Sequence, residues 1–122
     1  MNKLKVIIAC FFLASMAKAQ FRVVGYIHSG RQMPDISKVN FQKITHLNIA
    51  FVNPDSVGNP ILPAGLDSLT MLAHMNKVKV LLSIGGGSHN PYYTKLLTDS
   101  MRGIFTEKLI SLVATHNLDG LD

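Results

Sequence analysis

The chain has 122 residues, of which 48% are hydrophobic and 16% are charged, together with nine glycines and five prolines. This balance is typical of a globular protein and excludes disordered and collagen-like chains. The formal net charge is +5, but Lys3, Lys5 and Lys18 lie in a segment that we expect to be removed, which leaves a surplus of only about two positive charges. Because there is also no run of basic residues, we do not expect a nucleic-acid partner.

Residues 1–19 have the features of a secretory signal peptide. Two lysines near the start precede an almost wholly apolar run, residues 6–15, and Ala17 and Ala19 flank Lys18 in the small-x-small pattern that signal peptidase reads. The run is about ten residues long, whereas a membrane span needs about 20. We therefore expect no membrane span and a secreted or periplasmic protein cleaved after Ala19. A lipoprotein cleavage box ending at Cys10 is the weaker alternative.

Cleavage would leave about 103 residues, enough for one small domain. Cys10 is the sole cysteine, so the exported part would contain neither a disulfide nor a thiolate metal site. The five histidines show no metal-ligand spacing such as HxxxH. We therefore expect no metal and no cofactor.

The first two expected elements are short strands. Residues 22–27 form a β-branched and aromatic run that ends at a turn of residues 28–30, and residues 46–52 form a second run that ends at a turn of residues 53–55. Between the two runs, residues 34–41 have room for only a turn or two of helix.

Two helices and a third strand are expected next. Apolar residues recur at helical spacing over residues 66–77, and residues 78–84 are so continuously apolar that we expect a parallel strand covered on both faces. Residues 101–113 again repeat apolar positions at helical spacing, with Asp99 or Ser100 as the expected cap and Asn117 as the expected left-handed exit.

A fourth strand is expected to begin in residues 118–122. Strands alternating with helices are typical of right-handed parallel βαβ units, in a doubly wound sheet or in a (β/α)8 barrel. A barrel needs about 250 residues, so this chain would supply about the first three and a half βα units. We interpret residues 20–122 as the amino-terminal part of a longer barrel, truncated at the start of strand four.

Candidate functional residues follow the expected strands, where ligands bind in parallel α/β proteins. They are aromatic, hydroxyl and carboxylate side chains, with glycines in one loop: Tyr26, Phe51, Ser83, Gly85, Gly86, Asp119 and Asp122. We expect them on one rim, where aromatic rings could stack on a sugar and neighbouring carboxylates could perform acid–base chemistry.

The motif Ser83-Ile84-Gly85-Gly86 resembles the SxGG signature of the glycoside hydrolase family 18 chitinases. The motif Asp119-Gly120-Leu121-Asp122 resembles the first half of that family's DGxDxDxE signature. The two motifs stand in the family's order, each at an expected strand, and the resemblance extends over residues 20–122.

The resemblance implies a (β/α)8 barrel that cleaves β-1,4-linked N-acetylglucosamine glycans, such as chitin, with retention. In the family the substrate's own N-acetyl oxygen attacks the sugar, which departs from the scheme with two enzyme carboxylates. It implies that Asp122 shares charge with the next aspartate of the signature and is hydrogen-bonded by Ser83. It further implies a more structural role for Asp119, and a place for Tyr26 and Phe51 in the lining near the cleaved sugar.

Several alternatives remain open at this stage. The loop with Gly85 and Gly86 could cradle a phosphate, although it lacks the spacing of nucleotide-binding motifs. Tyr26 and Phe51 could be core aromatics, and residues 90–93 could be either a surface loop or part of a glycan groove. A glycan-binding protein without activity and an endo-β-N-acetylglucosaminidase would share the same motifs.

The general acid of the family would lie four positions beyond Asp122. Because a general acid contributes about 10²- to 10⁴-fold to a rate, we predict that the 122-residue polypeptide alone is inactive and poorly folded, whereas its parent is a hydrolase. Near-UV circular dichroism and release from a fluorogenic chitobioside would test this. Clear turnover by the short polypeptide would contradict the prediction.

Overall fold

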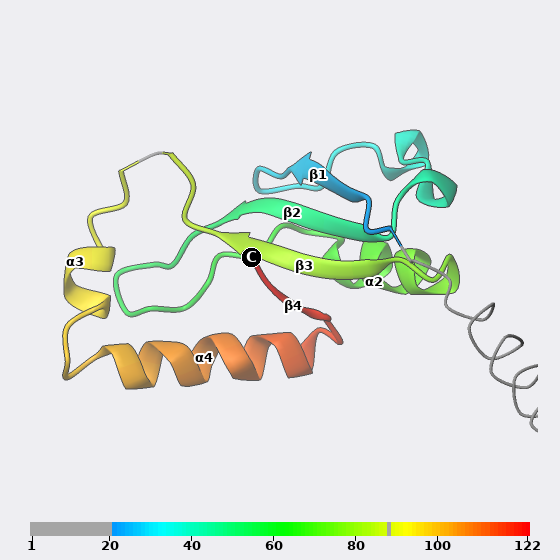
Figure 1. Cartoon of the computed structure of the whole chain (residues 1–122). Coiled ribbons are helices and arrows are strands. Elements are labelled where there is room, and N and C mark those ends of the chain that lie inside the picture. Colours follow the sequence, from blue (N-terminus) through cyan, green and yellow to red (C-terminus); the bar gives the residue numbers. More distant parts are fainter. Residues whose placement is uncertain (1–20, 88) are drawn as a thin grey trace, which may run out of the picture.

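The computed structural model describes residues 21–87 and 89–122. The expected signal peptide, its cleavage site and Cys10 lie outside the described residues. Four parallel strands form one sheet in chain order: β1 (Val24–His28), β2 (His46–Val52), β3 (Lys79–Ile84) and β4 (Gly120–Leu121) (Figure 1). The expected α/β class and all four expected strands are confirmed, with ends that differ by one or two residues.

The helices lie between the strands in the chain and beside the sheet in space. Figure 1 shows α2 behind the sheet and α4 along its β4 side. The helical elements are η1 (Ile36–Lys38), η2 (Phe41–Lys43), α2 (Leu66–Met75), α3 (Tyr93–Leu96) and α4 (Arg102–Thr115). Each of the two expected long helices is present. Of the two short 3-10 turns, η1 lies within residues 34–41, the segment expected to hold a turn or two of helix, and η2 begins at its last residue.

The hydrophobic core lies between one face of the sheet and the helices. Side chains alternate between the two faces of a strand, and Leu47, Val80 and Leu82 point to the covered face, where each is at most 1% exposed. On α2, Leu69 and Ala73 are fully buried one turn apart, as expected of a helix with one apolar face. This packing holds the sheet rigidly from one side.

The covered face of the sheet is called the outer face below, and the opposite face is called the inner face. The inner face carries more polar side chains and is more exposed, especially on β1. Val24 is 48% exposed and Tyr26 is 59% exposed, and the parallel register pairs Tyr26 with Asn48 and Ala50 with Ser83 on this face. The expectation that β3 is covered on both faces is therefore wrong for the described part of the chain. Val80 and Leu82 on its covered face are buried, whereas on the other face Lys79 is exposed, Leu81 is half-buried and Ser83 alone is buried.

The ends of α4 differ in part from expectation. The residue that caps its start is Met101, without a side-chain hydrogen bond, and Asp99 instead pairs with Arg102 at 2.9 Å. At the other end, Asn117 has a φ of 50°, which confirms the expected left-handed exit. In the described residues, no helix is both long and apolar enough to cross a membrane.

We predict that Leu69→Ala lowers the free energy of unfolding of the complete protein by about 2–5 kcal/mol, because it leaves a cavity in a fully packed core. Met71→Ala on the same helix is the matched control, since Met71 is 63% exposed and should cost only about 0.5 kcal/mol. Urea denaturation measures both losses, and equal losses would contradict the burial of α2 described above.

Candidate functional site at the carboxyl ends of the strands

Three side chains from different strands meet where the sheet ends. Asp122 Oδ2 accepts a hydrogen bond of 2.9 Å from the Ser83 hydroxyl and one of 3.0 Å from the Tyr26 hydroxyl. Ser83 is on β3, Tyr26 is on β1, and Asp122 directly follows β4. The structure thus brings together the serine and the carboxylate that the sequence motifs predicted to meet, and it adds the tyrosine to the same oxygen atom.

The register of the sheet explains this meeting. The Asp122 N–H donates to the Leu82 carbonyl, and the Ile84 N–H donates to the Asp122 carbonyl, each at 2.9 Å. These bonds hold Asp122 beside Ser83 on the inner face. Tyr26 joins them from across β2, where Asn48 is paired with Tyr26 and the small Ala50 is paired with Ser83.

The hydrogen bonds favour the charged form of Asp122. The Ser83 hydroxyl, followed by the Tyr26 hydroxyl, lowers the pKa of Asp122, while some loss of hydration opposes them and the Asn48 side chain adds to the lowering. A carboxyl whose pKa is lower in the folded state stabilises the fold above its ordinary pKa. That contribution is lost as the pH falls through the lowered value, so the cluster is built to hold a negative charge near neutral pH.

Asn48 is a site residue that the sequence reasoning missed. It is 4% exposed, lies on the inner face opposite Tyr26 and lowers the pKa of Asp122. Its Oδ1 has no hydrogen-bond partner among the described residues. An asparagine inside an otherwise apolar strand was the available signal, because buried amides need polar neighbours.

The two glycines after β3 leave room for an aromatic ring. Gly85 and Gly86 have φ values of +99° and +88°, which favour glycine, and a Cβ on Gly86 would lie 2.7 Å from Phe51 Cγ. Phe51 is 42% exposed, and its ring meets that of His28 edge to face at 6.4 Å. The rim therefore presents aromatic surface beside the Asp122 cluster, without the spacing of a phosphate loop.

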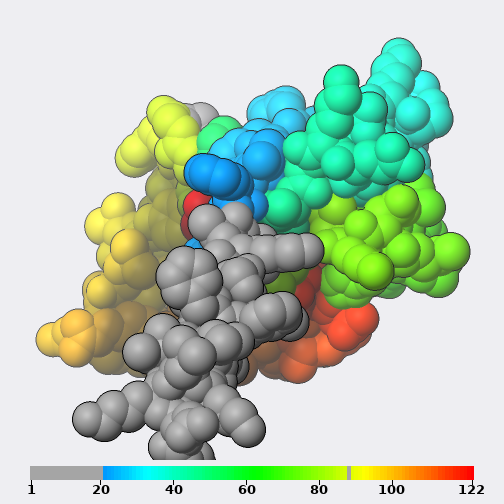
Figure 2. Space-filling view, turned by 45° about the vertical axis from the view of Figure 1, so that its right-hand side comes forward, coloured from blue at the N-terminus to red at the C-terminus, as the bar shows by residue number. Residues whose placement is uncertain are grey.

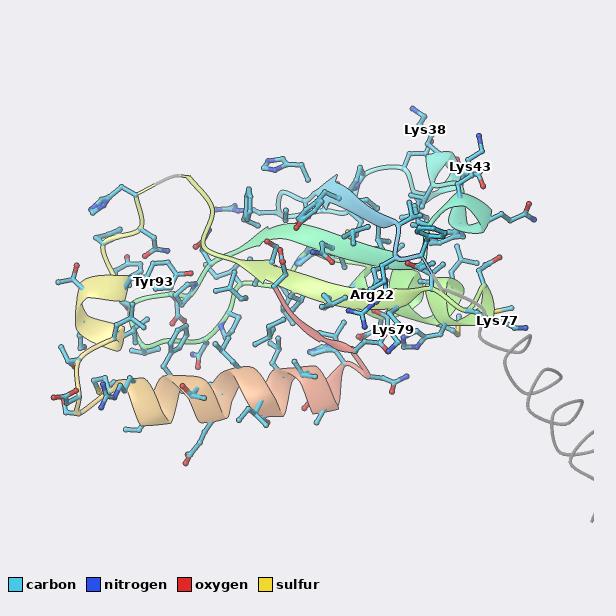
Figure 3. The ribbon with its side chains drawn as sticks, in the orientation of Figure 1. Arg22, Lys38, Lys43, Lys77, Lys79 and Tyr93 are labelled. Carbon is cyan, nitrogen blue, oxygen red and sulfur yellow. The ribbon has the colours of Figure 1, made fainter. Side chains whose placement is uncertain are left out.

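Asp119 does not lie on this rim, which corrects the expectation that both carboxylates gather there. Its Oδ2 accepts hydrogen bonds of 2.8 Å from the Val80 N–H and from His74 Nε2. It lines a hollow of about 320 Å³ together with Lys77 and Lys79, which Figure 3 places at the amino end of the sheet, opposite Tyr93. The two aspartates are three positions apart, so they point to opposite faces of the strand.

The charge of Asp119 is also favoured. Partial burial raises its pKa, but the Val80 N–H, His74 and the Lys79 charge together outweigh the burial, and the net pKa is lowered. Its expected catalytic role stays a prediction, and its contacts are those of a residue that holds β4 to its neighbours.

The two tyrosines of residues 90–93 have different environments. Tyr93 begins α3, donates a hydrogen bond of 2.9 Å to Asn53 Oδ1 and packs edge to face on Phe105 of α4. Burial raises the pKa of the Tyr93 hydroxyl. Tyr93 is thus a packing residue between the loop after β2 and α4, whereas Tyr92 is 40% exposed.

Residues 22–122 match the model of the glycosyl hydrolases family 18. A chitinase-like effector of Moniliophthora roreri is 33% identical over 92 residues, which are 71% of this chain and 23% of that protein. The crystal structure of the chitinase ChiB of Flavobacterium johnsoniae superimposes with a TM-score of 0.74 and 32% identity, over 83% of this chain and 35% of that one. The class V chitinase of Nicotiana tobaccum, solved in complex with NAG4, superimposes with a TM-score of 0.71 and 23% identity, over 84% of this chain and 32% of that one.

The chain therefore spans about a quarter to a third of the length of these relatives. The match with ChiB supports the expected partial (β/α)8 barrel, because the four parallel strands occupy the corresponding part of that fold. Within residues 21–87 and 89–122, no group of three or more histidine, cysteine or acidic side chains could hold a metal ion.

We predict that Gly86→Ala destabilises the rim, because its Cβ would overlap the Phe51 ring and its backbone is left-handed. The free energy of unfolding should fall by about 1–3 kcal/mol. Gly87→Ala is the matched control, since no atom lies within 4 Å of its added Cβ. Thermal denaturation of the complete protein measures both, and an unaffected Gly86→Ala variant would contradict the close approach of Phe51.

Proposed function

The chain belongs to the glycosyl hydrolases family 18, and from this we propose that the complete protein is an exported hydrolase of β-1,4-linked N-acetylglucosamine glycans, chitin or a related polymer. The observation that carries the proposal is the pair of hydroxyls, from Ser83 and Tyr26, on one oxygen of Asp122. Active sites of (β/α)8 barrels lie at the carboxyl ends of the strands, so a carboxylate held in this way is in position to act on a bound substrate.

The proposed chemistry is substrate-assisted and proceeds with retention. The N-acetyl oxygen of the substrate attacks its own sugar carbon, and positive charge develops on the sugar and its acetamido group. Asp122, kept ionised by Ser83 and Tyr26, stabilises that charge and can share a proton with a neighbouring carboxyl group as the charge changes. The leaving oxygen takes its proton from the acid of the family signature.

The aromatic side chains of the rim are proposed to bind the sugar. The Tyr26 hydroxyl is held by Asp122, yet the residue remains 59% exposed, and Phe51 remains 42% exposed. Rings that are fixed on one side and accessible on the other can stack on the apolar faces of N-acetylglucosamine at little entropic cost.

A second candidate function is glycan binding without hydrolysis. It is favoured by the similarity to a relative described as a chitinase-like effector. Such a protein would keep the rim that Tyr26, Phe51 and Asp122 form, and would lack proton delivery to the leaving oxygen.

The test is hydrolysis of the N-acetylglucosamine tetramer by the complete protein, followed by proton NMR of the first anomer formed. We expect cleavage with the β-anomer appearing first, and no cleavage of cellotetraose, which lacks the N-acetyl group that must attack. Asp122→Asn should lower kcat by about 10²-fold or more. Asp99→Asn is the matched control, because that carboxylate is 91% exposed and pairs only with Arg102 among the described residues.

The outcomes separate the two candidates. Retaining cleavage that depends on Asp122 supports the hydrolase. Binding of the tetramer by calorimetry without any cleavage supports the glycan-binding protein, and the absence of both binding and cleavage would contradict both proposals.

A further inference from the structure

The position of Asp122 depends on a very short strand. β4 has only two residues, and it pairs Gly120 with Leu81 and Leu121 with Leu82. A slip of one residue would turn Asp122 to the opposite face of the sheet, away from Ser83 and Tyr26. Two ladder pairs and the backbone hydrogen bonds of Asp122 form only a short contact, so an interaction on the other side of β4 would strengthen its register.

The Asp119 side chain supplies that interaction. The Asp119 N–H donates to the Val80 carbonyl at 2.8 Å, and the Val80 N–H donates to Asp119 Oδ2, also at 2.8 Å. Both backbone groups of Val80 are therefore bound by one residue of the segment that enters β4. A one-residue slip would break both bonds and leave the Val80 N–H, which lies in a fully buried residue, without an acceptor.

His74 on α2 orients this carboxylate. Its Nε2 donates to the same Asp119 Oδ2 at 2.8 Å, and its Nδ1 accepts from Asn117 Nδ2 at 3.4 Å. Nε2 carries a proton in this contact because an ionised carboxylate can only accept a hydrogen bond, and Asp119 therefore meets a donor. The His74 side chain is 30% exposed and that of Asp119 is 27% exposed, so water competes only in part.

From these contacts we propose that His74 is a positioning residue for Asp122, which acts by holding the Asp119 carboxylate on the Val80 N–H and thereby setting the register of β4. The inference deepens the proposed function and rests on it for the importance of Asp122. His74 does not reach the rim, because Asp119 and Asp122 lie on opposite faces of the strand. Its effect is therefore transmitted through three residues of backbone.

A second histidine–carboxylate pair on α2 provides a control. His116, next to the end of α4, contacts Asp67 of α2 through Nδ1 and Oδ1 at 2.6 Å. Figure 2 shows this end of α4, in orange-red, against the end of α2 and the turn into β3, in yellow-green. Both histidine–carboxylate pairs join α2 to the segment that leads into β4. Among the described residues, the Asp67 carboxylate is hydrogen-bonded to His116 and not to a strand that carries the site. Only the His74 pair should affect Asp122.

The test is a carbon-13 NMR titration of the Asp122 side-chain carboxyl in the complete protein, labelled at aspartate Cγ and assigned with Asp122→Asn. His74→Leu keeps the bulk of the side chain and removes the donor, and we expect it to raise the pKa of Asp122 toward its ordinary value, because the Ser83 and Tyr26 hydrogen bonds are lost with the register. His74→Gln returns an N–H near the Nε2 position and should restore the wild-type titration. His116→Leu should leave it unchanged.

Amide hydrogen exchange provides the second readout. The Ile84 N–H, which is bonded to the Asp122 carbonyl, should exchange about tenfold faster or more in His74→Leu and at the wild-type rate in His116→Leu. If His74→Leu does not fold, Asp119→Asn replaces it, since that change weakens the same carboxylate contacts with no change in shape.

The inference is overturned if His74→Leu, or Asp119→Asn in its place, leaves the Asp122 titration unchanged, or if His116→Leu shifts it equally. Either result would make His74 a general contact between helices. Because the titration needs no turnover, it decides this point whether or not the protein hydrolyses chitin. Absence of hydrolysis with the expected titration would remove the proposed function and leave the role of His74 intact.

Discussion

The pairing of β4 with β3 places two carboxylates of one short motif in two different environments. Asp119 and Asp122 are three residues apart, so they point to opposite faces and lie about 10 Å apart along an extended strand. Asp119 meets the backbone of Val80 and His74 of α2, whereas Asp122 meets Ser83 and Tyr26. One carboxylate therefore secures the strand and the other stands at the rim, and both depend on the same register.

The rest of the sheet supports this division. Its outer face is closed by residues such as Leu69, Val80 and Leu82, which are fully buried, and a packed face resists small displacements. Its inner face carries the polar residues that meet Asp122 and remains open in the described part of the chain. Rigid packing on one face thus holds hydroxyl and carboxyl groups in place on the other, as a preorganised site requires.

Three side chains make contacts that the sequence analysis did not predict. Asp99 or Ser100 was expected to cap α4, but Met101 occupies that position, and Asp99 pairs with Arg102. Tyr93 was expected in a loop, but Asn53 and Phe105, which are distant in the chain, draw it into a packed position at the start of α3. Asn48 was read as part of an apolar strand, and its nearness to Asp122 follows only from the alignment of β1, β2 and β3.

The sequence by itself determined the α/β class, the four parallel strands and the two long helices, because periodicity and turn residues act over short distances. The meeting of Ser83 with Asp122 was implied by the family resemblance of the two motifs that contain them. Tertiary structure alone decided which face each side chain occupies. It placed Tyr26 on the same oxygen as Ser83 and set Asp119 against His74 at the far end of the sheet. Such contacts join residues 45 to 96 positions apart, and strand register, which no local pattern encodes, determines whether they form.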